Sequence, residues 1–189
     1  MRRSPGRLLD IGAGSGTFVH ASLDAGWQAV GVELSEPAIE RAKEYYGIEL
    51  LKSLPDEEFD VITMWDVVEH LRDPAAVLQE LHGRLRRDGL LLMETGNYEN
   101  WLRVLEGERW SLYLLDHHFY FSPASLSSVV SRGGFSDFGV LDVAHFAPSL
   151  RRTLQQPRWG LRAWQTYFAS KRAWPRHGDI NVMVAVATA

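Results

Sequence analysis

The chain contains no cysteine, and this absence excludes several kinds of chemistry at once. Without thiols it has no disulfide bonds, no thiolate zinc site and no cysteine nucleophile. It also lacks any apolar stretch that approaches the length of a membrane span, and its first residues, MRRSPGRLLD, lack the apolar region of a secretory signal. These absences predict a cytoplasmic location.

The composition is that of one ordinary globular domain. The 189 residues are enough to bury a sizeable core, and the hydrophobic and charged fractions, 46% and 23%, are typical of such domains. We therefore expect a single domain over residues 1–189. The formal net charge of −4 is unevenly distributed, because residues 150–178 contain seven Lys or Arg and no Asp or Glu. This basic, Trp-rich insert interrupts an otherwise acidic chain.

Strand and helix patterns alternate along the chain, which predicts an α/β fold with a doubly wound, mostly parallel sheet of seven strands. The strands are expected at residues 7–11, 28–33, 48–51, 59–65, 90–95, 135–144 and 181–187. Helices are expected at residues 16–25, 37–46, 73–86 and 122–132. An aromatic lid or insert, residues 96–121, separates the fifth and sixth strands, and the basic insert precedes the seventh. In such sheets, ligands bind beyond the carboxyl ends of the strands.

The most informative motif follows the first expected strand. In LLDIGAGSGTF, residues 8–18, an apolar run ends in Asp10, and Gly12, Gly14 and Gly16 follow at alternate positions. Glycines there allow a tight turn and let a ligand approach the main chain. The next helix directs free N–H groups and the positive end of its dipole at the turn. The motif predicts a site for a nucleotide-like cofactor, with a purely structural turn as the alternative.

The second expected strand also ends in an acid. Glu33 lies 17 positions after Gly16, at the end of AVGVE, where a carboxylate can accept hydrogen bonds from both hydroxyls of a ribose. An NAD site needs this acid too. Glu33 therefore supports a nucleotide-binding site but does not indicate which nucleotide binds. The G-x-G-x-G spacing departs from the G-x-G-x-x-G fingerprint, and no Tyr-Lys catalytic pair is recognisable. An NAD-dependent oxidoreductase is therefore disfavoured.

Several segments, in the same order, resemble the class I S-adenosylmethionine-dependent methyltransferases. Besides the glycine motif and Glu33, they are FDVITMWDVVEHLRDP (59–74), LQELHGRLRRDGLLLMETGN (78–97) and DHHFYFSPASLSSVVSRGGF (116–135). They are similar to a subgroup that includes the ubiquinone-pathway O-methyltransferases and related small-molecule methyltransferases. The resemblance implies a Rossmann-like methyltransferase fold and methyl transfer from S-adenosylmethionine to a small molecule, at oxygen rather than nitrogen or carbon.

A non-catalytic cofactor-binding or scaffold domain is the alternative function. Related enzymes usually carry helices before the glycine motif, whereas this chain begins almost at its first strand. Family members also often place an acid or amide after the third strand to bind the adenine amino group. Here Leu51, Lys52 and Ser53 stand at that place, so backbone groups of Ser53 and Leu54, or the side chain of Asp56, would take over that contact.

The resemblance also implies which residues hold the cofactor. Asp10 and the glycine loop would hold the methionine part, Glu33 the ribose, and Trp65 with Asp66 the wall near the methyl group. The full expected set is Asp10, Gly12, Ala13, Gly14, Gly16, Glu33, Leu34, Ser53, Trp65 and Asp66.

Three histidines are candidates for handling the acceptor, because a hydroxyl nucleophile needs a proton acceptor near neutral pH. His70 leads, since it follows the fourth expected strand on the side where substrate should enter. The alternative is that Glu69 and His70 cap the local turn or pack against Asp73. His117 and His118 are the second candidates, and we expect only one of the two to act. Packing beneath the next helix is the alternative role for this pair.

The same segments contain enough ligand types for a metal ion. They are Glu69, His70, Asp73, His117 and His118. No spacing among them demands a metal in the way that H-E-x-x-H does, so no metal ligand is assigned.

Aromatic residues in the insert are the expected substrate contacts. Trp110, Tyr113 and Tyr120 would wall a site for a planar or apolar acceptor, and the same rings would form the core of a small lid over the sheet. The two roles are compatible.

The basic insert admits three functional interpretations besides that of a solvated surface segment. Its arginines would grip a phosphate or carboxylate of the substrate, rest on an anionic membrane near a lipid-linked substrate, or bind nucleic acid. The acidic remainder of the chain disfavours nucleic acid. We expect a small-molecule partner, anionic or lipid-linked, with peripheral membrane contact left open. The sequence does not indicate an oligomeric state.

Overall fold

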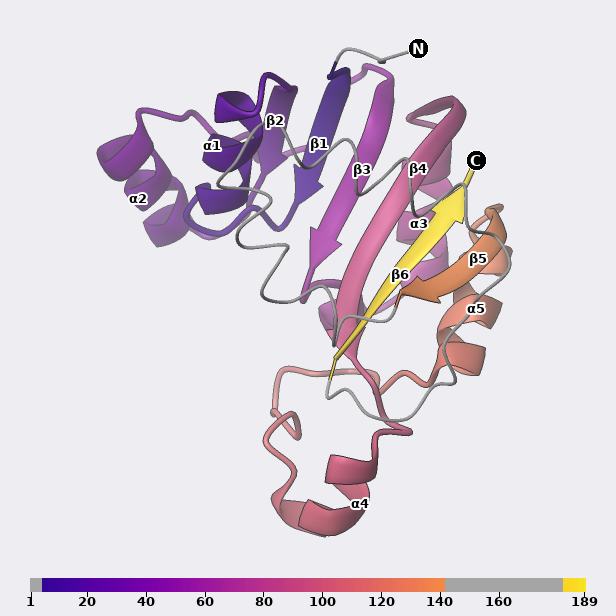
Figure 1. Cartoon of the computed structure of the whole chain (residues 1–189). Coiled ribbons are helices and arrows are strands. Elements are labelled where there is room, and N and C mark those ends of the chain that lie inside the picture. The colour runs from indigo at the N-terminus through magenta and orange to yellow at the C-terminus, as the bar shows by residue number, and fades with distance from the viewer. Residues whose placement is uncertain (1–4, 142–181) are drawn as a thin grey trace.

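In the computed structural model, which describes residues 5–141 and 182–189, strands and helices alternate as the sequence predicts (Figure 1). The strands are β1 (Arg7–Ile11), β2 (Gln28–Val32), β3 (Phe59–Trp65), β4 (Leu85–Gly96), β5 (Ser136–Leu141) and β6 (Val182–Thr188). The helices are α1 (Thr17–Asp24), α2 (Glu36–Tyr46), α3 (Pro74–His82), α4 (Trp101–Glu106) and α5 (Pro123–Arg132), with short 3-10 helices η1 (Val68–His70) and η2 (Gly107–Arg109). The basic insert at 150–178 and the end of the expected strand 135–144 lie outside the described residues.

The strands form one sheet in the order β2-β1-β3-β4-β6-β5. The first four are parallel, and β6 runs antiparallel to both β4 and β5. This confirms the mostly parallel α/β sheet. The chain reverses its order of strands beside β1, which is where ligands bind in folds of this kind.

The expected strand at 48–51 is the main departure, so the described residues form six strands rather than seven. Only Leu51 pairs with β2, through a single parallel bridge to Val32. Leu50 packs inward among residues of α1 and α2, while Lys52 and Ser53 are exposed. The run is too short to form further backbone pairs with β2. Leu50 packs against α1 and α2, and the chain then turns toward solvent at Lys52.

Strand β4 is longer than expected because it absorbs the turn predicted at Asp88-Gly89. Phe59 of β3 pairs with Leu85, whereas Val61 pairs with Leu90, so extra residues bulge from β4 between these pairs. Asp88 has a left-handed φ of 63° within the bulge. The predicted turn at Asp88-Gly89 therefore forms, but it kinks one strand instead of joining two elements.

Both faces of the central strands are buried, as their continuous apolar runs predict. On one face, Leu9, Ile62 and Met93 pack against residues of α3 and α5, and Figure 1 shows these two helices together on that side. Full burial of each such side chain contributes about 1.5–3 kcal/mol. A smaller cluster around Leu8 and Val61 occupies the opposite face.

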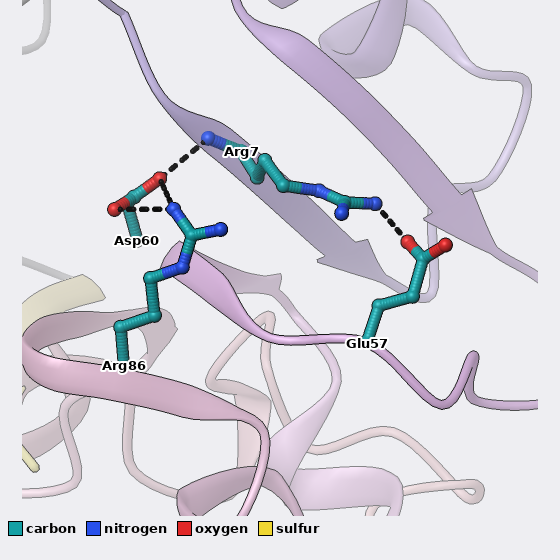
Figure 2. Close-up of polar contacts among 4 residues, drawn as sticks. All are labelled: Arg7, Glu57, Asp60 and Arg86. Carbon is teal, nitrogen blue, oxygen red and sulfur yellow. Dashed lines mark hydrogen bonds and ion pairs between the residues drawn. The ribbon is translucent and has the colours of Figure 1, made fainter.

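Charged residues join neighbouring strands at the amino edge of the sheet, the side at which β1, β3 and β4 begin (Figure 2). Asp60 accepts a hydrogen bond from the backbone N–H of Arg7 at 2.7 Å and from the guanidinium of Arg86 at 3.0 Å. The Arg7 guanidinium pairs with Glu57. These contacts join β1, β3 and β4 at the edge opposite the strand ends where a ligand is expected.

Among the described residues, every helix is too short or too polar to cross a bilayer. The cytoplasmic location stays a prediction of the sequence.

Candidate functional site

The glycine loop forms a tight turn at the carboxyl end of β1. The N–H groups of Gly12 and Ala13 both donate to the carbonyl oxygen of Val32, at 2.9 and 3.0 Å, which fixes the loop to the end of β2. Gly12 and Gly14 have φ values of 67° and 54°. A Cβ on Gly12 would lie 2.5 Å from Val67, whereas a Cβ on Gly14 would meet nothing within 4 Å. The main chain at Gly14 is therefore open to a ligand.

Glu33 connects the end of β2 to this loop. Its Oε2 accepts the Gly14 N–H at 2.8 Å, and its Oε1 accepts the N–H groups of Leu34 and Ser35 at 2.7 and 2.8 Å. A carboxylate offers about four lone-pair sites, so roughly one remains for a ligand hydroxyl. The predicted acid thus lies beside the open main chain of Gly14.

Asp10 lies inside the sheet, where only 1% of its surface is exposed. It is the register partner of Thr63, whose hydroxyl donates to Asp10 Oδ1 at 2.6 Å. Burial raises the pKa of Asp10 from 3.8 to about 7; the Thr63 hydrogen bond opposes the shift, and the nearby charge of Glu33 adds to it. A cationic ligand near Asp10 would favour its charged form.

One face of the sheet changes from apolar to polar toward the carboxyl edge. Leu8 and Val61 are register partners, followed two residues later by Asp10 and Thr63, and then by the neighbouring pair Trp65 and Glu94. Because side chains alternate along a strand, these residues share a face. Polar groups are thereby gathered at the strand ends, where the sequence places the cofactor.

Trp65, Leu34 and Ser53 lie around this edge. Trp65 packs edge-on against Phe18 of α1 with ring centroids 5.0 Å apart, and its buried Nε1 has no hydrogen-bond partner among the described residues. Leu34 directly follows Glu33 and is 77% exposed, and Ser53 is exposed after the bridge at Leu51. An orphaned donor and an uncovered apolar side chain both suit a surface that takes a ligand.

A second group forms where β3 leads into η1. Asp66 has a left-handed φ of 53°, a strained conformation for a residue other than glycine. The carbonyl of Glu69 accepts the backbone N–H of His118 at 2.8 Å, which ties η1 to the loop before α5. The rings of His70 and His117 meet edge to face with centroids 4.7 Å apart. The structure thus unites His70 with His117.

The remaining candidates are placed outside this group. The backbone of His118 contributes the link to Glu69, but its exposed side chain is not one of the clustered ligand groups. Asp73 accepts the N–H of Ala76 at 3.1 Å and caps α3, so its carboxylate serves the helix. His82 of α3 packs on Phe135 with ring centroids 5.1 Å apart, away from this group.

Three carboxyls lie in this region: Asp66 and Glu69 are close to the histidines, and Glu94 is close to those two acids. Burial raises the pKa of Asp66, Glu69 and Glu94, and the charges of His117 and His70 oppose the shift at Asp66. Ligand atoms of Glu69, His70 and His117 all lie within 4.8 Å of one another. Glu94 was missed from the sequence, although an acid near the end of the apolar run LLLMET is an available signal.

The aromatic residues predicted to contact substrate lie together. The Tyr113 ring is 5.2 Å from both Trp110 and Tyr120, and the Tyr120 ring is 5.8 Å from His117. Tyr98, which the sequence did not single out, joins them at 6.1 Å from Trp110. Trp110 is buried while the tyrosines are partly exposed, so the group is both a small core and a surface that leads to the histidines.

Comparison with known proteins identifies a family and several relatives with which this chain shares sequence similarity. Residues 1–138 match the family described as "Methyltransferase domain". A ubiquinone biosynthesis O-methyltransferase from Psychrobacter arcticus is 25% identical over 167 residues, covering 77% of this chain and 65% of that protein. The corresponding enzyme from Haemophilus ducreyi is 28% identical over 143 residues, covering 64% of this chain and 61% of that one. The chain thus spans less than two thirds of either relative.

Solved structures agree on the fold. An S-adenosylmethionine-dependent methyltransferase from Mesorhizobium loti superposes with a TM-score of 0.65 at 18% identity, covering 100% of this chain and 94% of that one. One from Archaeoglobus fulgidus gives a TM-score of 0.66 at 17% identity, covering 98% and 86%.

Proposed function

Because the chain belongs to the methyltransferase domain family, we propose that it transfers a methyl group from S-adenosylmethionine to an oxygen of a small molecule. The observation that carries the proposal is the pairing of Gly14 with Glu33. The glycine leaves its main chain open, and the acid is held against its N–H at 2.8 Å. This combination suits a ligand with a ribose.

The residues present fit S-adenosylmethionine. Glu33 would accept a ribose hydroxyl, Leu34 would cover the adenine ring, and backbone groups near Ser53 would replace the missing acid or amide. The carboxylate of Asp10, buried below the loop, would stabilise the positively charged methionine part. The unpaired Nε1 of Trp65 gives this edge a further hydrogen-bond donor.

Once bound, S-adenosylmethionine supplies an electrophilic methyl group, whose bond to sulfur breaks with its electron pair left on sulfur while the new bond forms to oxygen. The protein must align the acceptor with that methyl group and keep water away. His70 and His117 would hold the acceptor oxygen and help remove its proton, because the two rings meet edge to face, with centroids 4.7 Å apart, beyond the end of β3. We assign the alignment of the acceptor to Trp110, Tyr113 and Tyr120, the aromatic side chains beside His117.

The acceptor is proposed to be a hydroxylated aromatic compound. The names of the curated relatives support oxygen as the acceptor atom. Tyr113, Tyr120 and Trp110 offer flat surfaces on the approach to His117, which suit a planar molecule. An anionic or lipid-linked acceptor is a further proposal, whose support lies in the basic insert outside the described residues.

A labelled-methyl assay tests the acceptor atom. Purified protein is incubated with methyl-labelled S-adenosylmethionine and matched pairs of ring compounds, diphenols against the corresponding diamines. We expect label on the diphenols and little on the diamines. Label on the diamines would contradict oxygen transfer, and cofactor binding with no transfer to any acceptor would favour the non-catalytic alternative.

A further inference from the structure

One arginine of the aromatic insert is held in place by an aromatic ring and a backbone carbonyl. Arg103 of α4 donates a hydrogen bond from its Nε to the carbonyl oxygen of Tyr98. Its guanidinium carbon also lies over the face of the Tyr98 ring, 4.1 Å from the ring centroid. Because the two contacts act on different parts of the guanidinium, together they restrict its orientation before any ligand binds.

The outer end of this guanidinium is available for a ligand. None of the ion pairs among the described residues includes Arg103, although Glu99 and Glu106 lie close to it in the sequence. Its side chain is partly exposed, and within the described part of the chain its hydrogen bond to Tyr98 uses only the Nε donor. Both Nη atoms therefore keep their donors free for an anionic group.

A line of rings connects Arg103 to the histidine pair. The Tyr98 ring centroid lies 6.2 Å from that of Tyr120, and the Tyr120 centroid lies 5.8 Å from that of His117. The backbone N–H of Tyr98 donates to the carbonyl oxygen of Phe121 at 2.8 Å, which joins the start of the insert to its end. A planar molecule that lies along these rings would extend from the histidine pair toward Arg103.

The tyrosine rings along this line offer an uncovered surface on a firm base. Tyr98, Tyr113 and Tyr120 are 36%, 38% and 37% exposed. Trp110 is buried and packs against all three, with ring centroids 6.1, 5.2 and 6.2 Å away. Exposed rings that share one buried support are typical of a surface that binds a ligand.

The two ends of this surface differ in charge. Asp66 and Glu69 lie close to the histidines, and Glu94 lies close to those two acids, so the histidine end is acidic. The other end carries the guanidinium of Arg103. An acceptor with one anionic group is repelled from the first end and attracted to the second, which gives it a single favoured direction.

From these observations we propose that Arg103 binds a carboxylate of the acceptor and so determines which end of the acceptor reaches the histidine pair. The two Nη atoms match the two oxygens of a carboxylate, with which a guanidinium forms paired hydrogen bonds. The inference rests on the proposed function for the identity of the ligand as an acceptor. It narrows the acceptor to a hydroxylated aromatic acid, and its support is independent of the basic insert.

Calorimetric titration with matched acids and esters tests the carboxylate site without using methyl transfer. The full-length protein, with S-adenosylhomocysteine present, is titrated with dihydroxylated benzoate, phenylacetate and cinnamate, and with the methyl ester of each. The series varies the separation between the ring and the carboxylate. We expect at least one acid to bind at least about tenfold more tightly than its ester, by a margin that shrinks as salt is added. Equal binding of acid and ester throughout the series, or no binding of any acid, would overturn the proposal.

Two arginines of the insert provide a matched pair of variants. Arg103→Ala should abolish the preference for acid over ester and leave ester binding unchanged, because the ester depends on the rings alone. Arg109→Ala removes an exposed charge from the neighbouring η2 and should leave the preference intact. An intact preference in Arg103→Ala, or an equal loss of acid and ester binding that reflects only the support of Tyr98, would refute the site. Melting curves by circular dichroism establish that each variant is folded.

A labelled-methyl assay of the same compounds separates this proposal from the proposed function. Loss of the acid preference in Arg103→Ala, with no label transferred to any compound, would sustain the carboxylate site and overturn the methyl-transfer proposal. Label transferred to the esters as efficiently as to the acids, in the wild type, would sustain methyl transfer and overturn the role of Arg103.

Discussion

At the scale of single residues, the sequence identifies groups by their type but not by their partners. Glu33 was recognised because it ends an apolar strand at a suitable distance from the glycines, and the structure places it against Gly14. The hydrogen bond between Asp10 and Thr63 was not predicted, because it depends on the register of β1 against β3. Cross-strand register is set by the packing of whole elements, and no local pattern near either residue encodes it.

The buried position of Asp10 predicts a particular dependence of stability on pH. With a pKa of about 7 when folded and near 3.8 when unfolded, the native state holds this proton more tightly. The stabilisation is full below pH 3.8 and is lost as the pH rises toward and through 7. Asp10→Asn removes the titration, so between pH 5 and pH 8 the wild type should lose stability relative to the variant, on the order of a few kcal/mol.

Denaturant unfolding of both proteins at pH 5 and pH 8 measures this difference. An identical pH dependence in the two proteins would show that Asp10 does not titrate between these values.

At the scale of elements, most strands were predicted, and the departures lie where packing or strand pairing competes with a local pattern. β1 and β3 match their expected bounds, because apolar residues dominate both segments. The run at 48–51 became a single bridge, since four residues make too few backbone pairs once Leu50 packs toward the helices. The kink in β4 shows the same competition, in which pairing with β3 overrides a local turn signal.

The contacts at the amino edge predict a change in stability that leaves the site intact. Asp60→Ala removes the acceptor of the Arg7 N–H and of the Arg86 guanidinium, and should cost about 1–3 kcal/mol of unfolding free energy. Glu49→Ala, which removes only an exposed ion pair with Lys43, should cost less than about 1 kcal/mol.

Chemical denaturation gives both values, and neither variant should change the affinity for S-adenosylhomocysteine. A loss of that affinity in folded Asp60→Ala protein would show that the amino edge and the site are coupled.

At the scale of the whole molecule, two features create the site. They are the order of the strands and the path of the segment before α5, which comes back to η1. The parallel strands place the glycine loop, Glu33, Trp65 and Asp66 at one edge, as α/β topology predicts. The aromatic insert extends beyond the carboxyl ends of β3 and β4, with α4 at its far end (Figure 1). Which of His117 and His118 would join His70 depended on the path of this insert, and irregular connections carry too little periodicity to predict a path.

The most direct test of the account is calorimetric titration of the purified chain with S-adenosylhomocysteine, with NAD as the control ligand. We predict binding of S-adenosylhomocysteine alone. Affinity should fall about tenfold to a hundredfold in Glu33→Ala, because one charge-assisted hydrogen bond contributes roughly 1.5–3 kcal/mol, and should stay unchanged in the exposed control Glu36→Ala. Absence of S-adenosylhomocysteine binding, equal binding of NAD, or full affinity in Glu33→Ala would contradict the assignment of this edge of the sheet to the cofactor.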